Sequence, residues 1–192
     1  STIYHKSINI AAACYLLLGL IFLIKFLMFR FSLRTSFITA FTIFSATGVY
    51  YYAVDETGMT HLYSFTLIAV FLYLLRRTKF FSKAGIWQML LAGSIAGLIV
   101  VIRPTNILFF SCFLFLDLGS KEELIIRLKV FFRKSIPFII GAFLFVLPQM
   151  LYWNHTFNEP IHYSYVNEGF DFANPELLKF WFSPRSGVFT YT

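Results

Sequence analysis

Charged residues are scarce in this sequence of 192 amino acids. They make up 13% of the chain, whereas an ordinary soluble domain carries about 25%. Hydrophobic residues make up 58%, and the mean hydropathy is +0.72. This balance argues against a soluble domain and predicts an integral membrane protein, in which the unit of organisation is an apolar helix of roughly 20 residues.

Cysteine is also scarce, and the short motifs of several enzyme classes are absent. Cys14 and Cys112 each lie inside an apolar run, so they do not form a disulfide framework. The sequence has no phosphate loop, no Cys-x-x-Cys pair, no haem motif and no Ser-His-Asp pattern. The histidines lack the spacing of a zinc site, so no metal-binding residue is predicted, and a divalent-metal requirement is left open.

Long apolar runs fill most of the chain and predict an all-α fold, a polytopic transmembrane bundle of about six spans. A separate stretch, 121–134, has helically spaced apolar residues with basic residues mostly elsewhere, which is typical of an interfacial helix. The predicted spans are 8–29, 34–53, 58–75, 84–102, 104–118 and 136–153. They form a transmembrane domain, 1–153, followed by an aromatic-rich segment, 154–192, that leads to a further span. We expect a fragment of a longer protein.

Basic residues are concentrated in alternate gaps between these runs. Twelve of the sixteen Lys and Arg residues lie at the ends of the first, third and fifth spans and in the gaps that follow them. Short cytoplasmic loops carry such an excess, so these gaps are predicted to be cytoplasmic and the tail after Trp153 to be extracytoplasmic. The net charge of +7 then reflects retention by anionic membrane lipids, and nucleic acid is not expected as a partner. The twelve residues are Lys25, Arg30, Arg34, Arg76, Arg77, Lys79, Lys83, Lys121, Arg127, Lys129, Arg133 and Lys134.

Three polar residues in the gap after the second span are candidate catalytic groups. Asp55 and Glu56 are adjacent carboxylates at a predicted membrane boundary, and His61 follows at the start of the next span. Such carboxylates can deprotonate a hydroxyl nucleophile. The alternative is that both are solvated loop residues and that His61 is a capping or interfacial residue.

Two arginines on the same predicted side are candidate phosphate-binding residues. Arg103 ends one short span and precedes Pro104, and Arg185 lies in the turn Ser183–Gly187. Arginine suits bidentate phosphate recognition, and an ionisable residue within the membrane is a functional candidate. The alternatives are a snorkelling Arg103 and an exposed turn residue at Arg185.

The chain also resembles a known family over three segments. These are Tyr50–Tyr52 with Asp55–Phe65, then Gly97-Leu98 with Arg103-Pro104-Thr105-Asn106, and finally Phe182–Thr192. They are similar to segments of bacterial polytopic glycosyltransferases of the GT-C superfamily, the relatives of protein O-mannosyltransferases and of the aminoarabinose transferase that modifies lipid A.

The resemblance implies a location in the bacterial inner membrane and a polyprenyl-phosphate sugar as donor, with no certain cofactor. It implies extracytoplasmic transfer with inversion at the anomeric carbon, while basic residues stabilise the departing lipid phosphate. The family's large first outer loop, with its catalytic Asp, follows the first helix, but here that gap is basic. We therefore expect the main base upstream of Ser1, with Asp55 and Glu56 as supporting acids.

Two competing interpretations come from other classes. A non-catalytic integral subunit of a larger membrane complex would tolerate loss of Arg103, Asp55 and Glu56. A transporter would show inverted repeats and matching broken helices, and the sequence shows neither.

Overall fold

The computed structural model describes residues 2–110, 115–116, 118–162 and 175–184, so Cys112 and Arg185 lie outside the described residues. The structure is 82% helix, and no strand occurs in the part of the chain that it describes. The predicted all-α class is therefore confirmed. The chain divides into two compact units, Ser1–Leu151 and Tyr152–Thr192.

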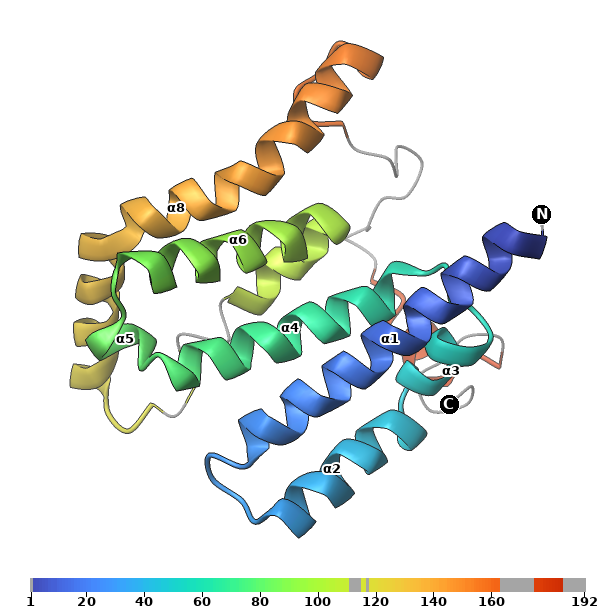
Figure 1. Cartoon of the computed structure of the whole chain (residues 1–192), viewed down its shortest axis with the longest axis horizontal. Helices are drawn as coiled ribbons and strands as arrows, with labels where there is room; N and C mark the ends of the chain where they lie inside the picture. The colour runs from blue at the N-terminus through green and yellow to red at the C-terminus, as the bar shows by residue number, and fades with distance from the viewer. Residues whose placement is uncertain (1, 111–114, 117, 163–174, 185–192) are drawn as a thin grey trace. The chain divides into compact units, whose positions relative to one another are not determined.

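Five helices of the first unit lie in a row, in the order α2, α1, α4, α6 and α8 (Figure 1). Short helices complete the turns between them. The described elements are α1 (Thr2–Leu27), α2 (Leu33–Ala46), α3 (Val49–Val54), α4 (Thr60–Arg77), α5 (Phe80–Lys83), α6 (Ile86–Ile102), the 3-10 helix η1 (Pro104–Leu108) and α8 (Lys121–Phe157). The second unit contains the end of α8 and the short helix α9 (Leu177–Phe182), where Lys179 pairs with Glu176.

Helices α1 and α4 run parallel and are joined at three levels. Near the start of α1, the Thr57 hydroxyl donates to Asn9 Oδ1 at 2.7 Å. In the middle, the buried Thr66 hydroxyl donates to the Tyr15 carbonyl at 2.8 Å. Near the end, the rings of Phe22 and Tyr73 pack edge to face with centroids 5.2 Å apart. The sequence order of these contacts is the same on both helices, which fixes the parallel direction.

Helices α6 and α8 touch backbone to backbone at glycines. A Cβ atom added to Gly93 would lie 1.9 Å from the Phe138 carbonyl oxygen, and one added to Gly97 would lie 2.4 Å from that of Ala142. From the other side, a Cβ on Gly141 would lie 2.2 Å from the Leu90 carbonyl oxygen. This glycine seam has the small-xxx-small spacing that lets helices approach closely in membranes.

The second predicted span is not one helix. The chain leaves the helical conformation at Thr47, which has φ −131° and ψ 172°, between α2 and α3. The Thr47 hydroxyl donates to the Ile43 carbonyl at 2.6 Å and accepts from the Val49 N–H at 3.3 Å. A threonine side chain that serves both neighbouring turns competes with the helical backbone bonds. The segment of the predicted span 34–53 is therefore divided between two helices, α2 and α3.

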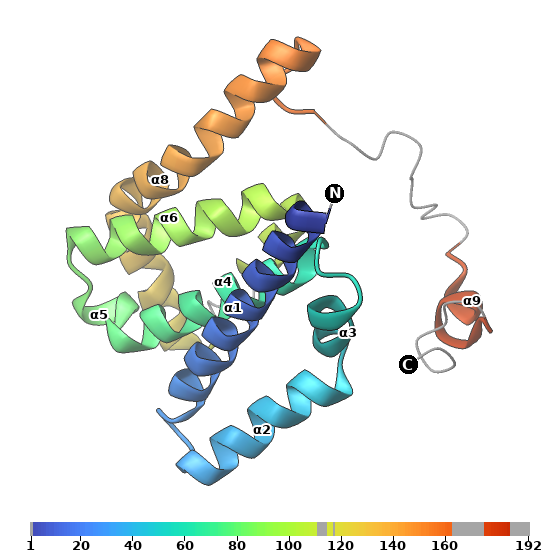
Figure 2. The same cartoon turned by 45° about the vertical axis from the view of Figure 1, so that its right-hand side comes forward.

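The predicted interfacial helix and sixth span are joined in the structure. Helix α8 runs without interruption from Lys121 to Phe157 and includes Pro137 and Pro148. It bends between its tan amphipathic part and its orange apolar part in both views (Figures 1 and 2). Proline inside a helix removes one backbone bond and bends the helix more often than it ends it. The predicted boundary between the interfacial helix and the sixth span therefore falls inside α8.

Two helices in the described ranges are long and apolar enough to cross a membrane, Ile3–Leu27 and Ser135–Phe157. Only 11% and 6% of their apolar windows are buried, whereas the apolar helix in the core of a soluble protein is mostly buried. This exposure is compatible with lipid contact. A six-span bundle is not confirmed, because α6 is shorter, the second span is broken, and the predicted 104–118 span begins as a 3-10 helix and includes residues outside the described ranges.

Candidate functional site

His61 and Arg103 meet at one end of the helix row, where α4 begins and α6 ends. The Arg103 Nη1 atom lies 2.8 Å from Nδ1 and 3.0 Å from Nε2 of His61. Because a position in the ring plane at both distances would collide with the ring carbon between the two nitrogens, the guanidinium nitrogen lies out of the plane. The guanidinium nitrogen therefore lies over a face of the imidazole ring, within hydrogen-bond distance of both ring nitrogens. Two residues predicted separately form one pair.

Tyr52 extends this pair into a three-residue stack. The rings of Tyr52 and His61 are stacked, with centroids 4.1 Å apart and planes 19° apart. Tyr52 lies on α3, so the stack links α3, α4 and the turn after α6. We refer to Tyr52, His61 and Arg103 as the aromatic–arginine stack.

The backbone around Arg103 is held by its neighbours in sequence. Arg103 is extended, with φ −155° and ψ 108°, as expected for the residue before a proline. Asn106 anchors the following turn, since its Nδ2 donates to Ser64 Oγ at 2.9 Å and to the Ile99 carbonyl at 3.1 Å. The turn between α6 and η1 is thus bound to α4 at two points, one through Arg103 and one through Asn106.

Asp55 and Glu56 lie in the loop that leads to His61. The N–H groups of both residues donate to the Tyr51 carbonyl, at 2.9 and 3.1 Å, which ends α3. Both side chains are exposed. Within the described residues, neither carboxylate forms a side-chain hydrogen bond or ion pair, so both lie on the loop next to the stack without a contact to His61 or Arg103.

A cavity of about 260 Å³ adjoins the stack on the side of the break between α2 and α3. Its wall includes Tyr52, together with His61 and Leu62 of α4, and the break supplies the other lining residues. The lining residues are Thr47, Gly48, Val49, Tyr52, His61 and Leu62. The broken helix therefore provides a recess beside the only histidine that contacts Arg103 in the described ranges.

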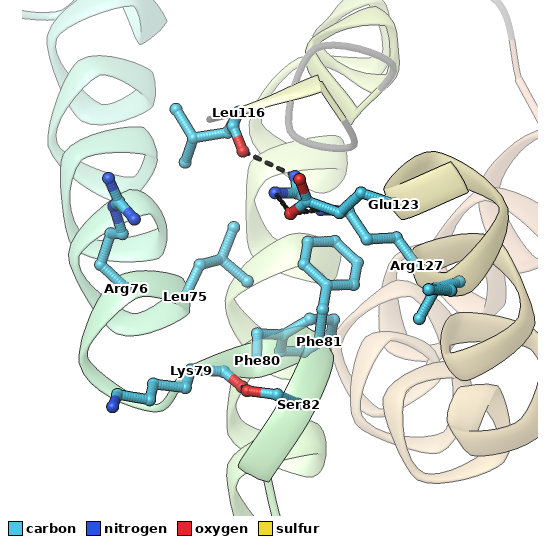
Figure 3. A pocket seen from close by; sticks show the side chains of 10 residues that line it. Leu75, Arg76, Lys79, Phe80, Phe81, Ser82, Leu116, Glu123 and Arg127 are labelled. Carbon is cyan, nitrogen blue, oxygen red and sulfur yellow. Dashed lines mark hydrogen bonds and ion pairs between the residues drawn. The ribbon is translucent and has the colours of Figure 1, made fainter. Parts of the chain in front are cut away.

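A second polar cluster lies where α8 begins, away from the stack along the chain. Arg127 is only 8% exposed. Its Nη1 donates to the Leu116 carbonyl at 2.6 Å, and its Nε and Nη2 donate to Glu123 Oε1 at 3.1 and 2.5 Å (Figure 3). The guanidinium also lies over the Phe81 ring, 5.1 Å from its centroid.

The charge on Glu123 is stabilised from two directions. Two donors hold the pKa of the Glu123 carboxyl below its usual value of about 4.5. The largest single contribution comes from the Gly119 N–H, which donates to Oε2 at 2.9 Å, and the next from Arg127. A carboxyl group with a depressed pKa stabilises the fold above the unfolded-state value, and this contribution is lost as the pH falls through the lower folded-state value.

Glu123→Gln is therefore expected to lower the thermal midpoint at neutral pH, and the gap to the wild type should close as the pH falls below about 4.5. Circular dichroism melts of both proteins over a pH series measure this gap. Glu56→Gln is the control, since within the described residues its exposed carboxylate forms no side-chain hydrogen bond or ion pair. A difference in thermal midpoint between Glu123→Gln and the wild type that does not vary with pH would show that the Glu123 charge does not cause it.

No group of three or more His, Cys, Asp or Glu side chains is placed to hold a metal ion within the described ranges. Arg185, the other predicted phosphate ligand, lies outside them. Sequence reasoning missed Tyr52, Asn106 and Ser64 as site residues. The signals present were the Tyr50–Tyr52 run before the acidic pair and the Asn three residues after Arg103.

The arrangement was compared with known proteins at the levels of sequence and structure. No family model, no curated protein and no solved structure matches the chain. Functional interpretation therefore depends on the residues of the aromatic–arginine stack and on the distribution of charge.

Proposed function

We propose that the chain belongs to an integral membrane glycosyltransferase that crosses a bacterial inner membrane about six times. In this proposal a sugar passes from a polyprenyl-phosphate donor to an acceptor on the extracytoplasmic side. The second crossing is made jointly by α2 and α3, and the others correspond to the remaining predicted spans. The tail after Trp153 is extracytoplasmic.

Two features of the helix row support the crossing pattern. An alternating path requires the first and third crossings to run in the same direction, and α1 and α4 are parallel. The acidic loop 55–56 and Arg103 lie at the ends of α3 and α6, whereas Arg76, Lys79 and Lys83 lie at the other end of α4 and in α5. Several basic residues are thus gathered at the end of α4 away from the acidic loop, and the positive-inside rule assigns an end with such an excess to the cytoplasm.

The observation that carries the chemical proposal is the stack of Arg103 on His61. A guanidinium fixed at a helix end can bind two phosphate oxygens and stabilise the charge that develops on a leaving phosphate. His61 and Tyr52 act as positioning residues, because they restrict where the guanidinium points. A fixed donor costs less reorganisation during the reaction than a mobile one.

The proposed reaction is a single displacement at the anomeric carbon of the sugar. The acceptor hydroxyl oxygen attacks the anomeric carbon from the face opposite the phosphate, and the bond between that carbon and the phosphate oxygen breaks. Its electron pair leaves with the polyprenyl phosphate, which Arg103 stabilises. A carboxylate takes the hydroxyl proton, and Asp55 and Glu56 assist that base as neighbouring acids.

The test measures sugar transfer from a polyprenyl-phosphate donor by the full-length protein in proteoliposomes. Asp55→Asn/Glu56→Gln is expected to slow transfer about tenfold or more, because general acid–base groups contribute factors of about 10² or more when they act directly. Glu159→Gln is the matched control, an exposed acid outside the loop. Transfer at the wild-type rate by the double variant would remove both residues from the site.

One observation favours the non-catalytic alternative. Both loop carboxylates are exposed and form no side-chain hydrogen bond or ion pair within the described ranges, whereas a catalytic base is normally oriented by a second group. A scaffold subunit would retain assembly when Asp55, Glu56 and Arg103 are replaced. Absence of transfer with every donor, together with intact co-purification of a partner, would support this alternative.

A further inference from the structure

Gly48 lies under the ring of Tyr52 at the break between α2 and α3. Tyr52 follows it one helical turn later, and the Tyr52 N–H donates to the Gly48 carbonyl at 3.0 Å. A long side chain on a helix points back over the preceding turn, which brings one edge of the tyrosine ring onto the glycine. A Cβ atom added to Gly48 would lie 3.2 Å from Tyr52 Cε2 and 3.6 Å from Cδ2. The position of the ring therefore depends on the missing side chain.

The backbone at Gly48 does not itself require glycine. Its φ of −58° and ψ of −5° lie in the right-handed region, which residues with side chains adopt freely. Carbon atoms in contact are normally about 3.5–4.0 Å apart, so a methyl group on Gly48 would displace the Tyr52 ring by roughly a few tenths of an ångström. Glycine at this position therefore provides space for the ring rather than conformational freedom for the chain.

The Tyr52 ring begins a chain of contacts that ends at Arg103. Its face stacks on His61, with ring centroids 4.1 Å apart and planes 19° apart. Arg103 Nη1 in turn lies 2.8 and 3.0 Å from the two nitrogens of His61. Groups packed this closely do not move independently, because close packing transmits small displacements. A displaced tyrosine ring would thus change the place of the imidazole against which the guanidinium is held.

The cavity of about 260 Å³ beside the stack gives the tyrosine ring one direction in which to yield. Gly48, Tyr52 and His61 all line it. A methyl group on Gly48 would move the ring of Tyr52 either towards His61 or into this cavity. The first movement pushes the imidazole against Arg103, and the second separates the two stacked rings. In both cases His61 loses the support that fixes its orientation.

We propose that Gly48 is a positioning residue for Arg103. It leaves room for the Tyr52 ring, the ring orients His61, and His61 fixes the guanidinium that the proposed reaction needs. The break between α2 and α3 thereby acts on a side chain at the end of α6. The effect on turnover rests on the proposed transferase function, whereas the effect on the orientation of Arg103 does not.

The experiment compares the full-length protein with its Gly48→Ala variant. In proton–nitrogen NMR spectra of arginine-labelled protein, the Nε–H signal of Arg103 is expected to shift, because the ring current of His61 acts on it with a strength that depends on distance and tilt. The signal is assigned by its loss in Arg103→Ala. The turnover number should fall about threefold to tenfold with little change in KM, since a misplacement of about 1 Å costs about 10²-fold. Gly58→Ala is the matched control, whose methyl meets nothing within 4 Å, and it should change neither quantity.

A second pair of variants tests the route from Gly48 to Arg103. Without the tyrosine ring, a methyl group on Gly48 has nothing to displace, so Gly48→Ala/Tyr52→Ala should give the same Arg103 signal and the same turnover number as Tyr52→Ala alone. An unmoved Arg103 signal in Gly48→Ala would overturn the proposal, and so would losses that add in the double variant. Melting temperatures check that each variant is folded. Absence of transfer by the wild type would overturn only the proposed function, because the NMR comparison does not require transfer.

Discussion

Gly93→Ala is expected to destabilise the protein, although alanine normally favours a helix. In an open helix position, replacement of glycine by alanine gains about 1 kcal/mol from helix propensity. At Gly93 the added methyl would lie 1.9 Å from the Phe138 carbonyl oxygen, and backbone atoms of α8 cannot move as a flexible side chain can. Overpacking of this kind costs about 1–3 kcal/mol, so the contact outweighs the propensity. Unfolding by sodium dodecyl sulfate in mild detergent measures the change.

The glycine seam also predicts how two substitutions combine. Gly141→Ala should destabilise in the same way, because its methyl would meet the Leu90 carbonyl from the opposite helix. Once one methyl has separated α6 from α8, the second costs less, so the double variant should lose less stability than the two single losses together. Gly58→Ala is the control, since its methyl meets nothing within 4 Å. A Gly93→Ala protein as stable as Gly58→Ala would show that the helices are not in backbone contact.

Arg103→Ala is expected to reduce the turnover number of sugar transfer by about 10² to 10³, the usual effect of removing one preorganised donor to a developing oxyanion. Donor binding should weaken less, because the charge on the leaving phosphate grows only in the transition state. Initial rates at varied donor concentrations separate the two effects. The Asn106 bonds to Ser64 and Ile99 remain in this variant, so the turn after α6 should keep its position.

Two further variants define what Arg103 does. Arg103→Lys should recover part of the rate, because a single ammonium keeps the charge but not the bidentate geometry. Arg34→Ala, an exposed arginine at the start of α2, is the control and should transfer sugar normally. A normal turnover number for Arg103→Ala would remove the proposed leaving-group role, whatever the fate of the other site residues.

The sequence alone predicted the positions of the helices whose apolar runs are uninterrupted. The predicted spans 58–75 and 84–102 lie close to α4 and α6, because both are apolar runs bounded by charged or turn residues. One proline and one threonine explain two differences between the predicted and the observed helix bounds, a longer helix at Pro137 and a shorter one at Thr47. Pro137 indicated a helix start but lies inside α8, and Thr47 lay within an apolar run but ends α2 by bonding to the backbone on both sides.

The sequence predicts that the candidate site residues lie on the same side, but it does not predict which of them touch. Charge patterning placed His61 and Arg103 at the same predicted surface, yet they are 42 residues apart and nothing local indicates that they touch. The contact depends on α4 and α6 being antiparallel neighbours, a tertiary property. The glycine seam was missed for the same reason, since Gly93 and Gly97 form a recognisable pair only when the partner helix is known.

The parallel pairing of α1 with α4 has a consequence for biosynthesis. Tyr15 and its partner Thr66 are 51 positions apart, and all of α2 and α3 is made between them. At the usual synthesis rate of about 5–20 residues per second, α1 is complete roughly 3–10 s before its partner helix is made. During that interval Asn9 lacks the Thr57 hydroxyl that it bonds in the finished fold. The nascent chain is therefore exposed to mispairing at this helix until α4 has been made.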